Sequence, residues 1–168
     1  MRRGDGDGRG QDLTGRQALS GQEALIREAT AADMPQVWSL IGELAAFERL
    51  SHAVTGSAEA LAEHLGKHFY CFVCLEGDET VGYCLGFNTY STFRTQPGLW
   101  LEDLYVTPSR RGQGHGKAML QFLIDWCARE GFGRLEWSVL DWNVGAIGFY
   151  ERMGATLLPD WRICRVSF

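Results

Sequence analysis

A glycine-rich run with basic side chains occupies the middle of the chain, from Arg111 to Lys117, and reads RGQGHGK. Residues 99–106 before it have the composition of a strand, and residues 118–127 after it carry apolar side chains at helical spacing. Glycine allows positive φ and a close approach to the backbone, while the first N–H groups of a helix attract anions. The run therefore predicts a phosphate site of main-chain amides, with Arg110, Arg111 and Lys117 as nearby cations.

The spacing of the glycines disfavours the two commonest nucleotide sites. Three residues separate Gly112 from Gly116, and Ala118 stands where a P-loop needs a hydroxyl that binds magnesium. A dinucleotide fingerprint that starts at Gly112 requires glycine at position 117, which is lysine, and the preceding strands do not form βαβ units. The simpler alternative is a glycine turn that only caps a helix.

Several segments around the run resemble the GNAT family of N-acetyltransferases. The glycine run itself matches the family signature R/Q-x-x-G-x-G/A. The segments 43–48 (ELAAFE), 101–106 (LEDLYV) and 137–143 (WSVLDWN) are similar to its diamine (spermidine/spermine) acetyltransferase branch. The resemblance extends over residues 25–166.

The resemblance implies acetyl-CoA as the cosubstrate, held mainly by main-chain groups. Its pyrophosphate is expected on the amides of the glycine run, and its acetyl and pantetheine parts along residues 104–106. Asn143 is expected to contact the pantetheine arm, although an asparagine at this place also caps a helix. The residues that the resemblance places against acetyl-CoA are Leu104, Tyr105, Val106, Arg111, Gly112, Gln113, Gly114, His115, Gly116, Lys117, Asn143, Ala146 and Tyr150.

Acetyl transfer to an amine needs a neutral amine, a stabilised oxyanion and a proton for the departing thiolate. An alkyl ammonium has a pKa near 10.4, so a base must take its proton at neutral pH. The resemblance assigns this role to Glu102 and makes Tyr150 the general acid, because a phenol is protonated at pH 7. An ordinary core aromatic beside Phe149 is the alternative for Tyr150. No cysteine has a neighbouring histidine in sequence, so we expect direct attack without an acyl-enzyme.

Glu102 and Asp103 are adjacent, and strict alternation along a strand would turn them to opposite faces of the sheet. The resemblance implies a β-bulge in this strand, which changes the alternation. Asp103 is then either a second carboxylate of the site or a structurally paired acid. The sequence leaves both interpretations open.

Acidic residues predict a site for a cationic substrate. An acidic slot suited to a polyamine or a lysine-like amine can be formed by Glu43, Glu48, Glu102, Glu136 and Asp160. The substrate contacts implied by the resemblance are Phe47, Glu48, Glu102, Asp103, Glu136, Trp137 and Ser138. The predicted substrate is a small primary amine such as a diamine, a polyamine or thialysine. The alternatives are acetylation of a protein lysine or an antibiotic amine, and a non-catalytic acyl-CoA-binding module.

Length and charge agree with a single enzyme domain. The 168 residues are 45% hydrophobic and carry a net charge of −5, which argues against partners such as nucleic acid or an anionic membrane. Residues 1–20 hold four arginines and three aspartates with few apolar side chains. We expect them to form a disordered N-terminal tail before an acetyltransferase domain of residues 21–168.

Cysteine usage and the absence of targeting signals indicate a cytoplasmic protein. Five cysteines, an odd number, lie among apolar neighbours, which is typical of buried reduced thiols. No stretch has the roughly 18 apolar residues of a membrane span, and residues 1–20 lack the apolar core of a secretory signal. His64 and His68 have no evident third ligand, so no metal site is predicted. The resemblance adds the expectation of a homodimer.

Hydrophobic periodicity predicts the elements that position these residues. The expected strands are residues 24–29, 69–75, 80–88, 99–106, 134–139 and 161–168, and the expected helices are residues 33–50, a segment from Ser57, 118–130 and 143–153. The order is β-α-α-β-β-β-α-β-α-β, which belongs to the α+β class. With the resemblance, it predicts a GNAT fold: a mixed, mostly antiparallel sheet of six to seven strands flanked by about four helices.

Overall fold

The computed structural model describes residues 14–19 and 22–167, and the chain divides into two compact units. The larger unit comprises residues 1–136 and the smaller unit residues 137–168. Each unit has its own secondary structure. That residues 21–168 form a single domain stays a prediction.

The larger unit is built on one sheet of six strands, in which neighbours along the chain are neighbours in space. The strands are β1 (Thr14–Leu19), β2 (Gln22–Glu28), β3 (Tyr70–Glu76), β4 (Glu79–Ser91), β5 (Gln96–Val106) and β6 (Leu135–Glu136). All pairs are antiparallel except β5 and β6, which are parallel. The predicted α+β class and mixed, mostly antiparallel sheet are therefore confirmed. Five of the strands are long, and the strand expected at residues 134–139 is present only as the two-residue β6.

β1 lies within the segment that the sequence predicts to be a tail. It pairs with β2 in a register that runs from Thr14 opposite Arg27 to Leu19 opposite Gln22. Main-chain hydrogen bonds to a neighbouring strand order this segment, although its sequence holds few large apolar residues. The prediction of a disordered tail is therefore wrong for residues 14–19, whereas residues 1–13 and 20 lie outside the described part.

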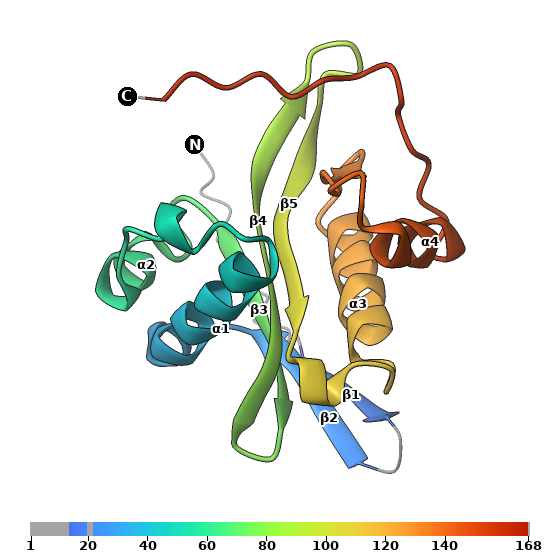
Figure 1. The fold of residues 1–168 in the computed structure, drawn as a ribbon. Helices are drawn as coiled ribbons and strands as arrows, with labels where there is room; N and C mark the ends of the chain where they lie inside the picture. Colours follow the sequence, from blue (N-terminus) through green and yellow to red (C-terminus); the bar gives the residue numbers. More distant parts are fainter. Residues whose placement is uncertain (1–13, 20–21, 168) are drawn as a thin grey trace, which may run out of the picture. The chain divides into compact units, whose positions relative to one another are not determined.

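Helices cover both faces of the sheet in the larger unit (Figure 1). They are α1 (Met34–Phe47), α2 (Ala58–His64) and α3 (His115–Arg129), as predicted. α1 and α2 lie over one face and α3 over the other. The side chains of β3 alternate between the two faces. Cys71 and Val73 pack in one core with Val37 of α1, whereas Phe72 contacts Trp126 of α3, with ring centroids 5.1 Å apart.

A β-bulge interrupts β5 where the sequence places its two adjacent acids. Leu85 of β4 pairs with Asp103, but the next residue, Gly86, pairs with Leu101, so Glu102 is the extra residue of the bulge. A Cβ at Gly86 would lie 2.6 Å from the main-chain oxygen of Trp100, so only glycine fits opposite the bulge. The bulge that the family resemblance implies is confirmed.

The smaller unit contains α4 (Val144–Arg152), which Asn143 caps by accepting a hydrogen bond from the Ala146 N–H at 3.2 Å. Residues 155–167 after it contain no helix or strand. The predicted strand over 161–168 is therefore wrong for residues 161–167, and residue 168 lies outside the described part. Alternating apolar residues indicated a strand, but a strand needs a partner, and none in the described part of the chain pairs with this segment.

Four of the cysteines are buried free thiols: Cys71, Cys74, Cys84 and Cys127. Cys164 is exposed, so the prediction of a buried thiol is wrong at that position. Burial raises the pKa of Cys71, Cys74 and Cys127 to about 12, which makes these thiols poor nucleophiles at neutral pH. This agrees with a reaction that forms no acyl-cysteine.

The described residues contain neither a candidate membrane span nor a candidate metal cluster. None of their helices combines the length and apolar character that crossing a membrane requires. Their His, Cys, Asp and Glu side chains form no group of three or more that could hold a metal ion.

Candidate active site

The glycine run between β5 and α3 has the backbone of an anion site. Gly112 and Gly114 adopt φ of +76° and +95°, values that residues with a Cβ rarely take. α3 begins at His115, and its N-cap residue, Gly114, has no side chain that could cap the helix. An anionic ligand at this end can accept from the first N–H groups of α3 and is favoured by the helix dipole.

Two of the three predicted phosphate cations have other partners. Arg110 contacts Glu76, with its Nε 2.9 Å from the carboxylate, and Glu79 at 3.5 Å. The Nε–H of Arg111 donates to the main-chain oxygen of Val106 at 2.9 Å. The side chain of Lys117 is exposed, so of the three cations it fits the predicted phosphate contact best. The acidic neighbours of Arg110 reduce the positive charge that it offers to a phosphate.

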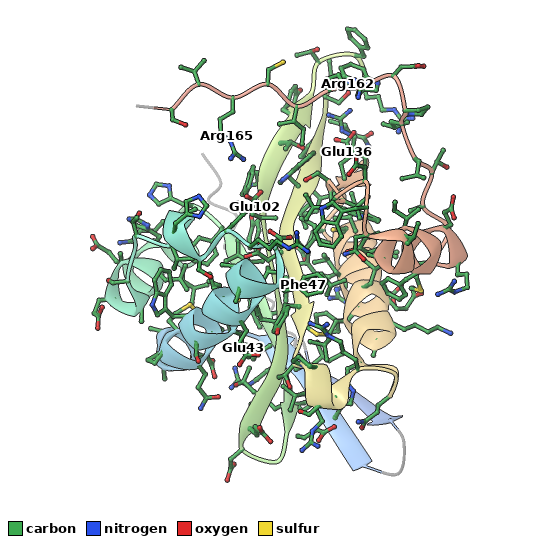
Figure 2. All side chains as sticks on the ribbon, in the orientation of Figure 1. Glu43, Phe47, Glu102, Glu136, Arg162 and Arg165 are labelled. Carbon is green, nitrogen blue, oxygen red and sulfur yellow. The ribbon has the colours of Figure 1, made fainter. Side chains whose placement is uncertain are left out.

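The Arg111 guanidinium joins β5 to the end of α1. It lies over the ring of Phe47 at 5.3 Å and over that of Tyr105 at 5.2 Å, both measured to the ring centroids. Tyr105 in turn donates its hydroxyl to Glu43 of α1 at 3.0 Å. Figure 2 shows Glu43 and Phe47 on α1. Arg111 therefore fixes the junction of the glycine run with α1 through cation–π contacts.

His115 is buried and its side chain points away from the predicted phosphate site, toward β3. Its Nε2 lies 2.6 Å from Oε1 of Glu76, and the same carboxylate contacts Arg110 through its other oxygen. The His115 side chain and Glu76 are 0% and 7% exposed. Only the main chain of His115 is thus left for a cofactor contact, while Glu76 contacts both this residue of the glycine run and Arg110, which directly precedes the run.

Replacing Glu76 with alanine is expected to lower the free energy of unfolding by about 3 kcal/mol, because it leaves the buried His115 side chain and the Arg110 guanidinium without the carboxylate that both contact. Urea denaturation measures this change. Glu79→Ala is the matched control: Glu79 is 67% exposed and contacts the same arginine, so its loss should cost less than about 1 kcal/mol. Equal losses in the two variants would contradict the structural role of Glu76.

Glu102 projects from the bulge with its side chain exposed. The indole Nε1–H of Trp100 donates to its Oε2 at 2.9 Å, which orients the carboxylate and leaves further lone pairs available. Figure 2 shows Glu102 on β5. An exposed, oriented carboxylate can accept a proton from a bound ammonium, directly or through water.

Asp103 turns toward the interior, where the hydroxyl of the fully buried Tyr83 donates to its Oδ2 at 3.0 Å. Burial raises the pKa of Asp103 to about 6; the Tyr83 hydrogen bond lowers it, and the charges of Glu102 and Glu48 raise it. Burial, followed by the charge of Glu102, also raises the pKa of Glu48. Glu48, Glu102 and Asp103 thus form one group of mutually repelling carboxylates, which favours a bound cation.

The raised pKa of Asp103 makes stability depend on pH. In the unfolded chain Asp103 ionises near pH 4, but in the folded protein near pH 6, so folding stability is lost as pH rises through this window. Asp103→Asn keeps an acceptor for Tyr83 and does not ionise. We compare the free energy of unfolding of this variant with that of the unmodified protein. The difference should be about 2 kcal/mol more favourable to the variant at pH 8 than at pH 4. Urea denaturation at both pH values measures this; a pH-independent difference would contradict it.

A pocket of about 330 Å³ opens beside Asp103. One wall is a face of α1, another is the segment of residues 50–56, and Glu48 and Asp103 contribute carboxylates. Most of the remaining lining is apolar, including Trp38, Ile41 and Val54. Such a pocket can take the carbon chain of an amine while its cationic end meets the carboxylates.

Residues 33–155 match the Acetyltransferase (GNAT) family. The chain belongs to the GNAT family of acetyltransferases. Among curated relatives of this GNAT protein, thialysine N-epsilon-acetyltransferase of Mus musculus is 38% identical over 146 residues, which cover 80% of this chain and 85% of the relative. The L-ornithine N5-acetyltransferase of Arabidopsis thaliana is 28% identical, with 84% of this chain and 83% of the relative covered.

Solved structures confirm the GNAT fold. An integron cassette protein of V. cholerae superposes with a TM-score of 0.72 at 20% identity, covering 86% of this chain and 93% of that one. An aminoglycoside acetyltransferase from an uncultured soil metagenomic sample superposes with a TM-score of 0.71 at 20% identity, covering 86% and 95%. At this level of identity the likeness establishes the fold alone.

The acidic residues predicted to form a slot in this GNAT enzyme have different neighbours, and the slot itself stays a prediction. Glu48 and Glu102 interact electrostatically, and Asp103 joins them. Glu43 instead accepts the Tyr105 hydroxyl, and Glu136 binds Arg134 at 2.8 Å. Asp160 is exposed in the smaller unit. The residues that line the pocket from α1 and residues 50–56 were not expected from the sequence, because only their positions in the fold bring them together.

In the smaller unit of this GNAT enzyme, Tyr150 lies on α4. Its ring contacts Trp137, with centroids 5.0 Å apart, and Phe149 at 5.2 Å. Ser138 lies in the segment before α4, which has no helix or strand. Asn143 performs the capping role that the sequence allowed. The catalytic role of Tyr150 and the cofactor contacts of Asn143 and Ala146 stay predictions.

Proposed function

We propose that this enzyme transfers the acetyl group of acetyl-CoA to a primary amine of a small cationic substrate, by direct attack of the amine. The observation that carries the proposal is the arrangement at the bulge. It exposes Glu102 while Asp103 and Glu48 lie in an adjoining pocket whose other walls are largely apolar. The three carboxylates repel one another, so a bound ammonium is favoured among them. The apolar wall accommodates the carbon chain of the amine.

The glycine run fits the anionic end of acetyl-CoA. Its positive-φ glycines and the start of α3 offer amides to a pyrophosphate, and the main chain of residues 104–106 leads toward Glu102. When bound, acetyl-CoA supplies an acetyl group activated as a thioester. We assign the phosphate contacts to the amides from Gly112 to Lys117, with the Lys117 side chain as the added charge.

Glu102 accepts a proton from the substrate ammonium, which leaves a neutral, nucleophilic amine. Asp103 and Glu48 bind the ammonium before this proton transfer. Tyr150 donates a proton to the departing thiolate, because a phenol with a pKa near 10 is protonated at pH 7 and a thiol has a pKa near 8.5. The assignment of Tyr150 rests on the family pattern. We infer that both units act as one catalytic domain, because the family match over residues 33–155 spans them.

The names of the relatives suggest thialysine, ornithine and related diamines or polyamines as substrates. The net charge of −5 supports a cationic small molecule over nucleic acid as the partner. We further propose a homodimer in the cytoplasm, by likeness to the diamine branch. Phe47, Trp137 and Ser138 remain proposed substrate contacts, although Phe47 also packs on Arg111.

A panel of amines with acetyl-CoA tests the proposal through release of the coenzyme A thiol. The panel contains diamines, polyamines, thialysine, ornithine, alkyl monoamines, an aminoglycoside and a lysine-containing peptide. Thiol release that depends on a small amine, with formation of its N-acetyl product, is the expected result. Turnover only with the peptide or the aminoglycoside would contradict the substrate class, and thiol release without any acetylated amine would contradict the transfer.

A further inference from the structure

We propose that Tyr83 is a positioning residue of the amine site, whose buried hydroxyl holds Asp103 in place as a charged ligand for the substrate ammonium. This inference rests on the proposed acetyl transfer and adds to it a core residue that lies outside the pocket lining. The register of β4 and β5 and the surroundings of the Tyr83 hydroxyl carry it.

The register of β4 and β5 brings Tyr83 to Asp103. Leu85 of β4 lies opposite Asp103, and Tyr83, two residues before Leu85, has its side chain on the same face of the sheet. Tyr83 is thus a diagonal neighbour of Asp103 across the strand pair, within reach of a long aromatic side chain. Its hydroxyl donates to Oδ2 of Asp103 at 3.0 Å.

The Tyr83 ring is fixed in the core. Its side chain is 0% exposed and packs in one cluster with Val37 and Leu40 of α1, and its ring centroid lies 6.4 Å from that of Tyr105. Burial, followed by the charge of Asp103, raises the pKa of Tyr83, so the phenol keeps its proton throughout the neutral range. The hydroxyl is therefore a donor of fixed position and fixed protonation state.

Asp103 needs such a donor in order to be charged at neutral pH. Burial raises its pKa to about 6, and the charges of Glu102 and Glu48 raise it as well. Among the described influences on Asp103, the Tyr83 hydroxyl is the one that lowers this pKa. Cys71 of β3 also interacts with Asp103, but burial raises the pKa of this thiol to about 12, so it stays neutral. Without the hydroxyl, Asp103 would stay protonated to higher pH.

The Asp103 carboxylate can serve Tyr83 and a substrate at the same time. It lines the pocket together with Glu48, and the described lining residues from segment 50–56 have no titratable side chain. A carboxylate offers about four lone-pair sites, of which the phenol uses one, so the others can accept from an ammonium. Tyr83 thus acts on Asp103 from the core, while the ammonium reaches it from the pocket.

The test is the pH profile of kcat/KM for the best amine of the panel, measured at saturating acetyl-CoA for the unmodified enzyme and for Tyr83→Phe. Phenylalanine keeps the ring and removes the donor. A hydrogen bond to a charged group shifts an equilibrium about tenfold or more, so Asp103 of the variant should ionise about one pH unit higher or more. We expect a deficit of about tenfold at pH 6 that shrinks to less than about twofold at pH 9.

The deficit should lie in KM for the amine, with kcat within about threefold of that of the unmodified enzyme, because a bound ammonium keeps Asp103 ionised. Tyr70→Phe is the matched control. It also removes a hydroxyl from the sheet, but Tyr70 contacts Trp126 of α3 on the opposite face, with ring centroids 4.9 Å apart. The pH profile of this control should not move.

A double-mutant cycle with Asp103→Asn shows whether Tyr83 acts through Asp103. Asparagine keeps an acceptor for the hydroxyl but carries no charge. Adding Tyr83→Phe to Asp103→Asn should therefore change kcat/KM less than about twofold at every pH. A loss as large as in the enzyme with Asp103 intact, or a Tyr83→Phe deficit that does not vary with pH, would overturn the inference while leaving the acetyl transfer intact.

Thermal unfolding at pH 5 separates this role from a purely structural one. Asp103 is largely protonated there in both proteins, so the Tm values of Tyr83→Phe and the unmodified enzyme should agree within about 5 °C. A variant that is unfolded at pH 5 would show that folding itself needs the hydroxyl and would overturn the inference. Unfolding that begins only as pH rises would agree with the ionisation of an unsupported Asp103. Turnover of no amine by the unmodified enzyme would overturn the proposed function, and this inference with it.

Discussion

Replacing Tyr150 with phenylalanine is expected to lower kcat about 100-fold while KM for acetyl-CoA stays within about twofold. The phenol is proposed to protonate the departing thiolate, an event of the transition state, so its loss should affect turnover rather than binding. Phenylalanine keeps the ring that contacts Trp137 and Phe149, so the packing of α4 is retained. Initial rates at varied acetyl-CoA, with saturating amine, separate kcat from KM.

Tyr90→Phe is the matched control for that experiment. Tyr90 is 60% exposed on β4 and has no part in the proposed chemistry, so kcat should not change. An unchanged kcat in Tyr150→Phe would remove Tyr150 from the mechanism and leave it as an aromatic of the helix. A joint loss of kcat and of thermal stability would point to packing instead.

Exchanging Glu102 for glutamine is expected to lower kcat/KM for the amine about 100-fold at pH 7, with a smaller deficit as pH approaches the pKa of the amine. Glu102 is the exposed, Trp100-oriented carboxylate of the bulge and the proposed proton acceptor. At high pH the amine is neutral without help, so the base matters less. The measurement is the pH profile of kcat/KM.

The Glu102→Gln substitution should also change the pKa of a neighbouring carboxylate. The charge of Glu102 contributes to the raised pKa of Asp103, so its removal should lower that pKa, which is about 6 in the unmodified protein. Glu63→Gln on the exposed side of α2 is the control and should leave both quantities unchanged. A pH profile of Glu102→Gln parallel to that of the unmodified enzyme would exclude Glu102 as the base.

The elements with strong local signals could be predicted from the sequence. The apolar spacing along α1 and α3 identifies these helices, and the change to alternation identifies β3 and β4. β1 could not be predicted, because its order comes from main-chain pairing with β2 rather than from its own side chains. Residues 161–167 show the reverse: alternation alone does not make a strand when no partner pairs with it.

The candidate site was predictable where the backbone determines it. The glycine run required positive φ, and Gly112 and Gly114 have it. Long-range partners were not predictable: the pairing of Arg110 and His115 with Glu76 joins segments more than 30 residues apart in the sequence. The contact of Tyr83 with Asp103 likewise depends on the register of β4 and β5, which decides that Asp103 turns inward.

Transfer of a labelled acetyl group tests the central claim most directly. The enzyme is mixed with acetyl-CoA labelled in the acetyl group and with the best amine substrate of the panel, and the label in the protein and in the amine is followed by mass spectrometry over a single turnover. The account predicts that the label appears in the N-acetylated amine, at the rate of thiol release, with none attached to the protein. Label that enters the protein before the amine, or that never reaches an amine, would contradict direct transfer.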